Sequence, residues 1–244
     1  MSATSALRRG PGEDDRGGPP ARGGEGADLL ADHGRGDVAS HDVALDDASP
    51  LVPRSLGWLL AVGGAVGFLA AFVLTVERFK LALDPSYVPS CSLNPVLSCG
   101  SVMAKPQAAL FGFPNPMLGI AAFAVATTLG LLVVSRTPLP RWVWVGLQVG
   151  LTAGMVFVAW LVSQSLYSIG ALCPYCMVVW AVVIPMFVSV TATNLERGVL
   201  PTPAGARSAV VALSDYRVLV VVLVYLVVVA LAGVRFWDYW STLV

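Results

Sequence analysis

The sequence predicts an all-α integral membrane protein with five transmembrane helices. Of its 244 residues, 56% are hydrophobic and only 12% are charged, whereas a soluble domain averages about 25% charged residues. The mean hydropathy is +0.75. Several uncharged stretches lie between the charged residues. They have about the 20 residues that a helix needs to cross a bilayer.

Five such stretches are the predicted spans. From Trp142 to Leu195 no residue is charged. This stretch is too long for one crossing, so we expect it to turn back around Gly170 to Pro174. The last stretch is short, and it suffices if Arg217 and Arg235 extend their charged ends to the interface. The predicted spans cover residues 56–76, 116–134, 142–166, 174–191 and 218–234.

Residues 84–105 also contain a long uncharged stretch, but Pro85, Pro89 and Pro95 interrupt it. Proline in lipid leaves backbone groups unpaired, so we predict a loop that lies on the interface or dips into it. Glycines four residues apart predict close helix packing in the first and third spans: Gly63 with Gly67, and Gly146, Gly150 and Gly154.

Residues 1–55 differ from the rest in composition. They contain six Arg, ten acidic residues and both histidines, but no aromatic residue. Such a segment buries too little apolar surface to fold, so we predict a disordered cytoplasmic tail. His33 and His41 have no ligand partners at metal-binding spacing, and no metal site is predicted. Residues 56–244 are expected to form one membrane domain.

Positive charge predicts the orientation, because cytoplasmic loops are rich in Lys and Arg. With the N-terminus inside, the loops on that side hold six such residues and the outer segments hold four. We therefore expect a protein of the cell inner (cytoplasmic) membrane with a cytoplasmic N-terminus. The inner six are Arg54, Arg136, Arg141, Arg197, Arg207 and Arg217, and the outer four are Arg78, Lys80, Lys105 and Arg235.

All four cysteines lie in two loops that must share one side of the membrane. Cys91 and Cys99 follow the first span, and Cys173 and Cys176 follow the third. Both spans are odd-numbered, so this conclusion holds for either orientation. With the N-terminus inside, the four cysteines face the oxidising, extracytoplasmic compartment.

The run Cys173-Pro-Tyr-Cys176 is predicted to open a helix, because Pro suits the first helical position. A helix N-terminus stabilises a thiolate, and sulfurs three residues apart lie on one helix face. In the other loop, Asn94 and Pro95 predict the start of a short helix that ends before Pro106.

Cys99 would lie on that short helix and Cys91 on the flexible approach to it. A mobile outer thiol and a positioned inner thiol suit a relay through mixed disulfides. Lys105 is expected to be the only charged side chain near the cysteines. The part of the chain after residue 55 has no His, so conventional acid–base or metal-assisted hydrolysis has few groups to use.

Two other interpretations remain open at this point. In one, the cysteines form static disulfides in a non-enzymatic membrane subunit or transporter, although the third and fourth spans hold no acid or base to carry ions. A four-cysteine zinc or iron–sulfur site would need more closely spaced pairs. Nucleic-acid binding by bulk electrostatics is excluded, because it needs a basic surface and the net charge is zero.

Several motifs resemble the bacterial vitamin K epoxide reductase homologues. They are the two cysteine pairs, the run Asn94-Pro-Val-Leu-Ser-Cys-Gly-Ser-Val-Met and the run Phe111-Gly-Phe-Pro-Asn-Pro116. The resemblance covers residues 56–244 and implies a four-helix bundle around a quinone plus a fifth span. In many relatives that span leads to a fused thioredoxin-like domain. We expect a form without that domain, which implies a separate DsbA-like thioredoxin-fold oxidase as the partner.

The resemblance also implies roles for individual residues. Cys91 would exchange with the partner, Cys99 would pass electrons to Cys173, and Cys176 would face the quinone. Asn115 matches an Asn that hydrogen-bonds a quinone oxygen, and menaquinone is a better expectation than ubiquinone. The expected apolar walls of the quinone site are Phe111, Phe113, Met117 and Trp180, for each of which packing or lipid contact is the simpler interpretation.

The chain departs from many relatives at Lys105, where they carry a Ser. Either that role is dispensable or Ser101 covers it. An unrelated four-span, quinone-linked disulfide oxidase would perform the same chemistry, but the fifth span and the Phe-Gly-Phe-Pro-Asn run disfavour it.

Overall fold

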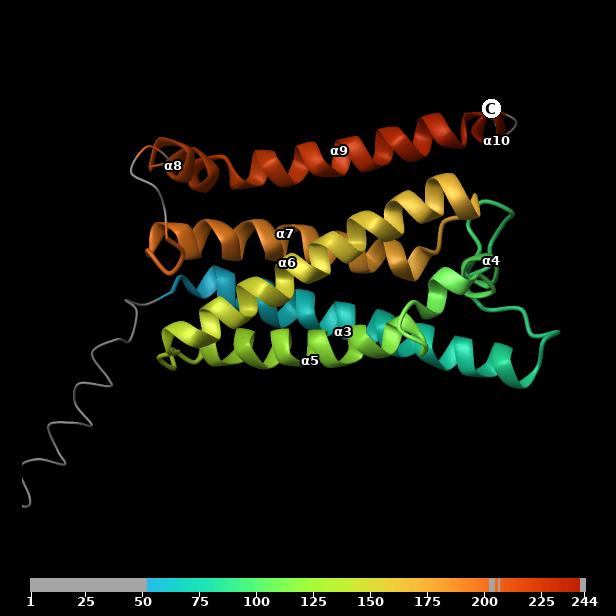
Figure 1. Cartoon of the computed structure of the whole chain (residues 1–244), viewed down its shortest axis with the longest axis horizontal. Helices are drawn as coiled ribbons and strands as arrows, with labels where there is room; N and C mark the ends of the chain where they lie inside the picture. Colours follow the sequence, from blue (N-terminus) through green and yellow to red (C-terminus); the bar gives the residue numbers. More distant parts are fainter. Residues whose placement is uncertain (1–51, 202–204, 206, 242–244) are drawn as a thin grey trace, which may run out of the picture. The chain divides into compact units, whose positions relative to one another are not determined.

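The computed structural model describes residues 52–201, 205 and 207–241, and within them the five predicted spans are confirmed as helices (Figure 1). Each of the five is long and apolar enough to cross a membrane. The predicted boundaries agree within three residues except at the ends of α3 and α7, which continue seven and five residues further than expected. The long helices are α3 (Arg54–Leu83), α5 (Asn115–Val134), α6 (Arg141–Ser163), α7 (Pro174–Glu196) and α9 (Arg217–Arg235).

Shorter helices connect and flank the spans. The helix α4 (Cys99–Met103) and a 3₁₀ turn (Pro106–Ala109) follow α3, and a π-helix (Gln164–Ile169) extends α6. Two more, α8 (Arg207–Asp215) and α10 (Trp237–Trp240), flank α9. The predicted disordered tail, apart from residues 52–55, lies outside the described residues. The boundary of the membrane domain therefore stays a prediction.

In the described part, α3 packs against both α5 and α7, while α7 also packs against α6 and α9. Close packing through the first-span glycines is confirmed, because a Cβ added at Gly67 would lie 2.5 Å from the Phe123 ring and one at Gly63 would lie 3.1 Å from Met186. The prediction is wrong for Gly146 and Gly150, which have open space where a Cβ would lie.

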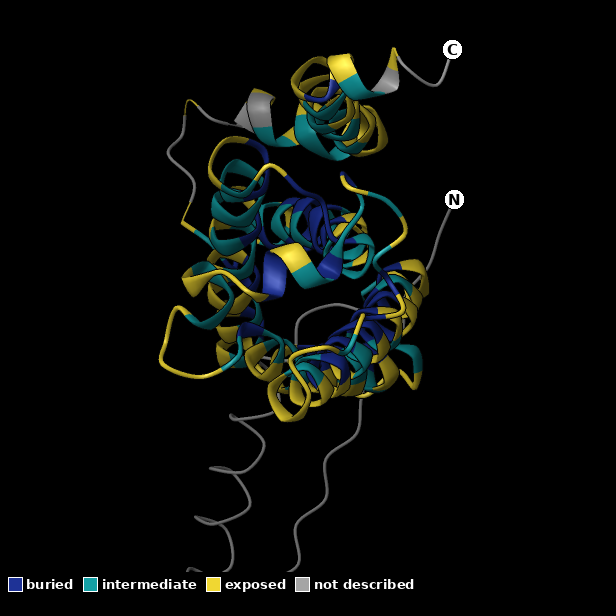
Figure 2. Ribbon diagram, turned by 90° about the vertical axis from the view of Figure 1, so that its right-hand side faces the viewer, coloured by how far each residue is buried: buried dark blue, intermediate teal, exposed yellow. Residues whose placement is uncertain are grey.

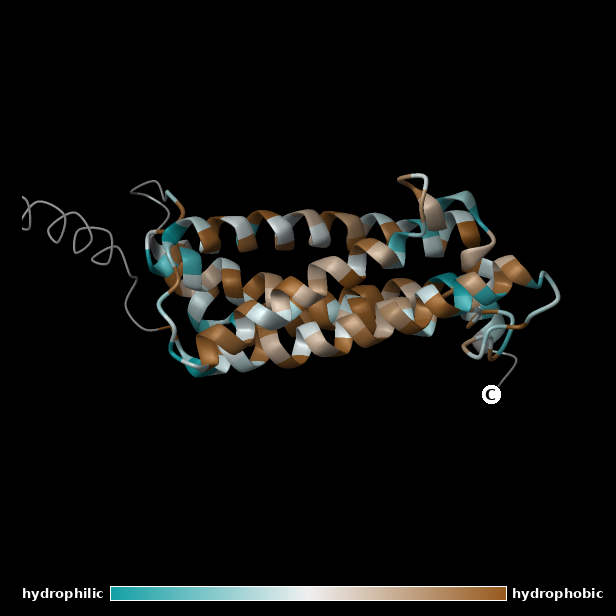
Figure 3. Ribbon diagram, turned by 90° about the horizontal axis from the view of Figure 1, so that it is seen from below, coloured by the Kyte–Doolittle hydropathy of each residue, from teal (hydrophilic) through white to brown (hydrophobic). Residues whose placement is uncertain are grey.

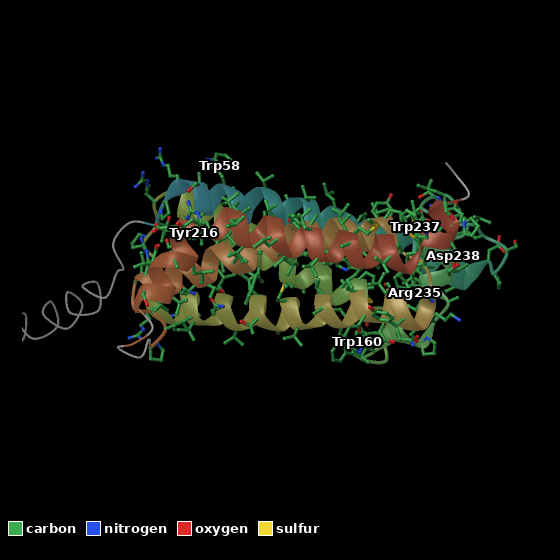
Figure 4. All side chains as sticks on the ribbon, turned by 90° about the horizontal axis from the view of Figure 1, so that it is seen from above. Trp58, Trp160, Tyr216, Arg235, Trp237 and Asp238 are labelled. Atoms are coloured by element: carbon green, nitrogen blue, oxygen red, sulfur yellow. A yellow bond between two sulfur atoms is a disulfide. The ribbon has the colours of Figure 1, made fainter. Side chains whose placement is uncertain are left out.

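The outer surface of the bundle fits a bilayer. The middle of the helices is coloured apolar, and the hydrophilic residues gather toward their ends (Figure 3). Trp58 and Tyr216 lie toward one end, and Trp160 and Trp237 lie toward the other (Figure 4). Aromatic residues at two such levels are typical of the two membrane interfaces. The buried residues face the interior of the bundle (Figure 2), and α9 has no buried residue at all.

Candidate active site

Both cysteine-bearing segments lie at one end of the bundle, beside α4 (Figure 1). Cys91 and Cys99 form a disulfide with a Cα–Cα distance of 5.5 Å. Both residues are buried, Cys91 at 6% exposure and Cys99 at 0%. Cys173 and Cys176 are free thiols. The structure therefore has an oxidised loop pair facing a reduced Cys-x-x-Cys pair.

The short helix that carries Cys99 begins later than expected. Asn94 does not cap a helix, because its side-chain oxygen accepts hydrogen bonds from the N–H groups of Val96 and Leu97 in a local turn. Ser98 is the N-cap of α4, and its hydroxyl accepts from the N–H of Ser101. The prediction of a helix from Pro95 is therefore wrong, whereas the position of Cys99 on a short helix is confirmed.

Charged side chains from the end of α3 fasten this loop. The buried Glu77 carboxylate accepts from the Tyr87 hydroxyl at 2.9 Å and from the hydroxyl and N–H of Ser90, the neighbour of Cys91. Arg78 donates to the carbonyl of Met103, the last residue of α4. The expectation that Lys105 is the only nearby charge is wrong, and the Lys105 side chain is exposed.

A small backbone bridge joins the two redox segments. The N–H of Leu172 donates to the Val96 carbonyl at 2.7 Å, and the Leu172 carbonyl accepts from the N–H of Ser98 at 2.9 Å. Two of the three bonded residues directly precede a cysteine, Ser98 before Cys99 and Leu172 before Cys173. The Sγ atoms of Cys99 and Cys173 lie 3.0 Å apart as a result of this register.

The Cys-x-x-Cys run opens α7 as predicted. Cys173 is the N-cap, Pro174 is the first helical residue, and Cys173 is only 1% exposed. The Cys176 thiol and the backbone N–H groups of Cys176 and Tyr175 stabilise the Cys173 thiolate. They hold the pKa of Cys173 below its usual value, although burial opposes them.

This arrangement suits thiol–disulfide exchange. A thiolate on Cys173 faces the sulfur of Cys99, which is already half of a disulfide. Attack there would form a Cys99–Cys173 bond and release Cys91 as a thiolate. The reverse reaction passes through the same mixed disulfide.

Two of the residues expected at the quinone site carry polar groups with unused bonding capacity, and one of them, Trp180, lies in the cluster against which Cys176 packs. Trp180 follows Cys176 by about one helical turn and is 5% exposed, and its indole N–H has no hydrogen-bond partner. Asn115, at the start of α5, donates to the Gln107 carbonyl at 2.7 Å and accepts from the Leu110 N–H at 3.0 Å. Its amide therefore shapes the 3₁₀ turn and retains one N–H and one acceptor site for another partner.

The other expected wall residues lie outside the buried cluster around Trp180. Phe111, Phe113 and Met117 are each at least 40% exposed and do not belong to the buried cluster around Trp180. Phe111 stacks on Phe113 and contacts Phe157 of α6, whose ring stacks on Trp160. No pattern in the sequence singles out Phe157 and Trp160, because aromatic residues on a lipid-facing helix have no distinguishing spacing.

The model of the vitamin K epoxide reductase family matches residues 58–191. The chain belongs to this family. A comparison with curated proteins gives no further match. Vitamin K epoxide reductases are oxidoreductases that act on disulfides and quinones, so the chain is a multi-pass membrane thiol–disulfide oxidoreductase that works with a quinone. The interpretation as a non-enzymatic subunit with static disulfides is set aside on this finding.

Proposed function

We propose that this vitamin K epoxide reductase homologue reoxidises a separate, extracytoplasmic, DsbA-like thioredoxin-fold protein. In this proposal electrons pass from the partner's dithiol to Cys91 and Cys99, then to Cys173 and Cys176, and finally to a quinone. The observation that carries the proposal is the 3.0 Å separation between the sulfurs of Cys99 and Cys173. Two static disulfides would not require the two pairs to approach each other this closely.

The first exchange would take place at Cys91. A partner thiolate attacks the Cys91 sulfur, the Cys91–Cys99 bond breaks, and Cys99 leaves as a thiolate. The partner's second thiol then displaces Cys91, so the partner becomes a disulfide and the loop pair becomes a dithiol.

The second exchange would pass the electrons inward. Cys99 attacks Cys173 of a Cys173–Cys176 disulfide, and Cys176 leaves as a thiolate. Cys91 then attacks Cys99 and displaces Cys173. The products are an oxidised loop pair and a reduced inner pair, which is the redox state of this structure. The lowered pKa of Cys173 makes it a good leaving group in this step.

The residues around Cys176 fit a quinone. When bound, a quinone would supply an acceptor for two electrons and two protons, so that Cys173 and Cys176 could return to a disulfide. A quinone presents carbonyl oxygens, and the buried indole N–H of Trp180 is a donor without a partner. We propose that Trp180 and Asn115 orient the quinone and that Phe111, Phe113 and Met117 contact its apolar parts.

The proposed topology places the cysteines outside the cytoplasm. The Arg distribution favours a cytoplasmic N-terminus in the inner membrane, and an oxidising compartment suits a disulfide relay. Menaquinone remains the preferred quinone on compositional grounds, since Arg outnumbers Lys 13 to 2 among the basic residues, as in proteins from GC-rich genomes.

The test is quinone reduction by the purified, membrane-reconstituted chain with a reduced thioredoxin-fold protein as the electron donor. We expect each of Cys91→Ser, Cys99→Ser, Cys173→Ser and Cys176→Ser to lower the rate to background. Ser86→Ala is the matched control, because its hydroxyl lies on the same loop and bonds only the exposed Asp84. Activity that survives the loss of Cys99 or Cys173 would contradict the relay.

A further inference from the structure

The C-terminal end of α9 returns to the redox end of the bundle, outside the residues that the family model matches. Arg235, the last residue of α9, donates through Nε to the Leu166 carbonyl at 2.9 Å. Its guanidinium group also lies 5.9 Å from the centre of the Phe236 ring. Phe236 is 7% exposed, whereas its neighbour Trp237 is 67% exposed. The fifth span therefore enters the core at Phe236.

Phe236 belongs to the same buried cluster as Leu166, Leu172 and Trp180. Leu166 lies in the π-helix, which ends at Gly170 in the left-handed conformation. Two residues later, Leu172 forms the backbone bridge to Val96 and Ser98. Arg235 and Phe236 thus contact the segment that leads directly into Cys173.

We propose that Arg235 and Phe236 are positioning residues for the exchange between Cys99 and Cys173. This proposal rests on the relay described above. Leu166 is 1% exposed, and its carbonyl lies in a π-helical turn that departs from regular α-helical bonding. By bonding this carbonyl and filling the space beside Leu172, the pair fixes the segment from Leu166 to Cys173. A misplacement of about 1 Å is enough to slow a reaction by about 100-fold.

A simpler role for Arg235 would be to reach the interface at the end of a short span. The inward hydrogen bond to a backbone carbonyl and the burial of Phe236 favour the positioning role. At the other end of α9, Arg217 lies on an exposed stretch of the same helix. Arg217 therefore offers a matched comparison for a purely interfacial arginine.

The experiment uses the full chain carrying Cys91→Ser and Cys176→Ser, so that only Cys99 and Cys173 remain. In a buffer of oxidised and reduced glutathione, one oxidised glutathione accepts two electrons for each Cys99–Cys173 bond formed. Two glutathione thiols are released. The equilibrium fraction of this bond gives the effective concentration of the two thiols, measured by mass spectrometry after alkylation.

We expect Arg235→Met to lower this effective concentration about tenfold or more, Arg235→Lys to restore part of it, and Arg217→Met to leave it unchanged. Phe236→Leu should lower it as well, and this variant decides the question if Arg235→Met does not fold. Unchanged values in Arg235→Met and Phe236→Leu, with only a lower unfolding temperature, would overturn the positioning role. If the parent protein with intact Arg235 forms no Cys99–Cys173 bond, the relay itself fails.

Discussion

The two segments that carry the cysteines are held in place in different ways. Side chains fasten the Cys91 segment, through the bonds of Glu77 to Tyr87 and Ser90. Main-chain geometry shapes most of the Cys173 segment, which has a π-helix, a left-handed Gly170 and a proline at the first position of α7. Its side-chain support is the bond from Arg235 to the Leu166 carbonyl. Each of the Glu77 bonds can break separately, so we expect the segment that would meet a partner to move more readily than the other. The segment next to the proposed quinone site depends mainly on its backbone, with Arg235 and Phe236 as the proposed side-chain support.

The largest expected effect is a difference in which electron donors each segment can use. It is measured by comparing quinone reduction with a protein donor and with a small dithiol. In Cys91→Ser the loop pair cannot exchange with a protein donor, and quinone reduction driven by a thioredoxin-fold protein should fall to background. A small dithiol such as dithiothreitol can instead reduce the Cys173–Cys176 disulfide directly. We expect Cys91→Ser to keep quinone reduction with dithiothreitol.

Cys173→Ser is the counterpart on the inner segment. It should lose quinone reduction with both donors, because no Cys173–Cys176 disulfide remains to be reduced. Equal losses in Cys91→Ser and Cys173→Ser with dithiothreitol would contradict the division between an outer, partner-facing pair and an inner, quinone-facing pair.

A smaller effect is expected when the backbone conformation of the inner segment is strained at Gly170. Gly170 has φ +70°, and the site where a Cβ would lie is open. Gly170→Ala therefore costs only backbone strain, about 1–2 kcal/mol. We expect this strain to shift Leu172 and to lower the effective concentration of Cys99 and Cys173, measured with glutathione as above. Gly170→Asn should behave more like the parent, because Asn tolerates this conformation.

Gly198 provides the control for Gly170. It follows the other end of α7 with φ +65° and has the same open space. Gly198→Ala should lower the free energy of unfolding by a similar amount without changing the Cys99–Cys173 equilibrium. If both alanine variants change that equilibrium equally, the effect comes from general destabilisation and not from the position of Leu172.

Much of this arrangement follows from local sequence signals. Long uncharged stretches mark the spans, and Pro174 marks the start of α7, because both depend on residues that are close in sequence. The start of α4 was mispredicted because Asn94 and Ser98 both offer a capping oxygen, and only the bridge to Leu172 selects Ser98. Such a long-range contact leaves no mark in the local pattern.

The anchors of the redox end were missed for a related reason. The predicted first span ended at residue 76 because Glu77 and Arg78 are charged, but α3 continues to Leu83 and carries both side chains to the loop. Their partners lie up to 25 residues away. Arg235 and Phe236 contact a segment about 70 residues earlier, and no sequence spacing indicates that contact.

The smallest expected effect concerns the anchor of the outer segment. Glu77→Gln keeps one acceptor oxygen but removes the negative charge and turns an amide N–H₂ toward the donors of Tyr87 and Ser90. We expect the free energy needed to open this loop locally to fall by about 1 kcal/mol. The change would be seen as faster hydrogen exchange at residues 87–91. The inner segment should be unaffected, because the bridge of Leu172 uses only main-chain atoms. Glu196→Gln, an exposed change at the end of α7, is the control. If the exchange rates around Cys173 rise as much as those around Cys91 in Glu77→Gln, the two segments are held as one unit and the contrast between them is wrong.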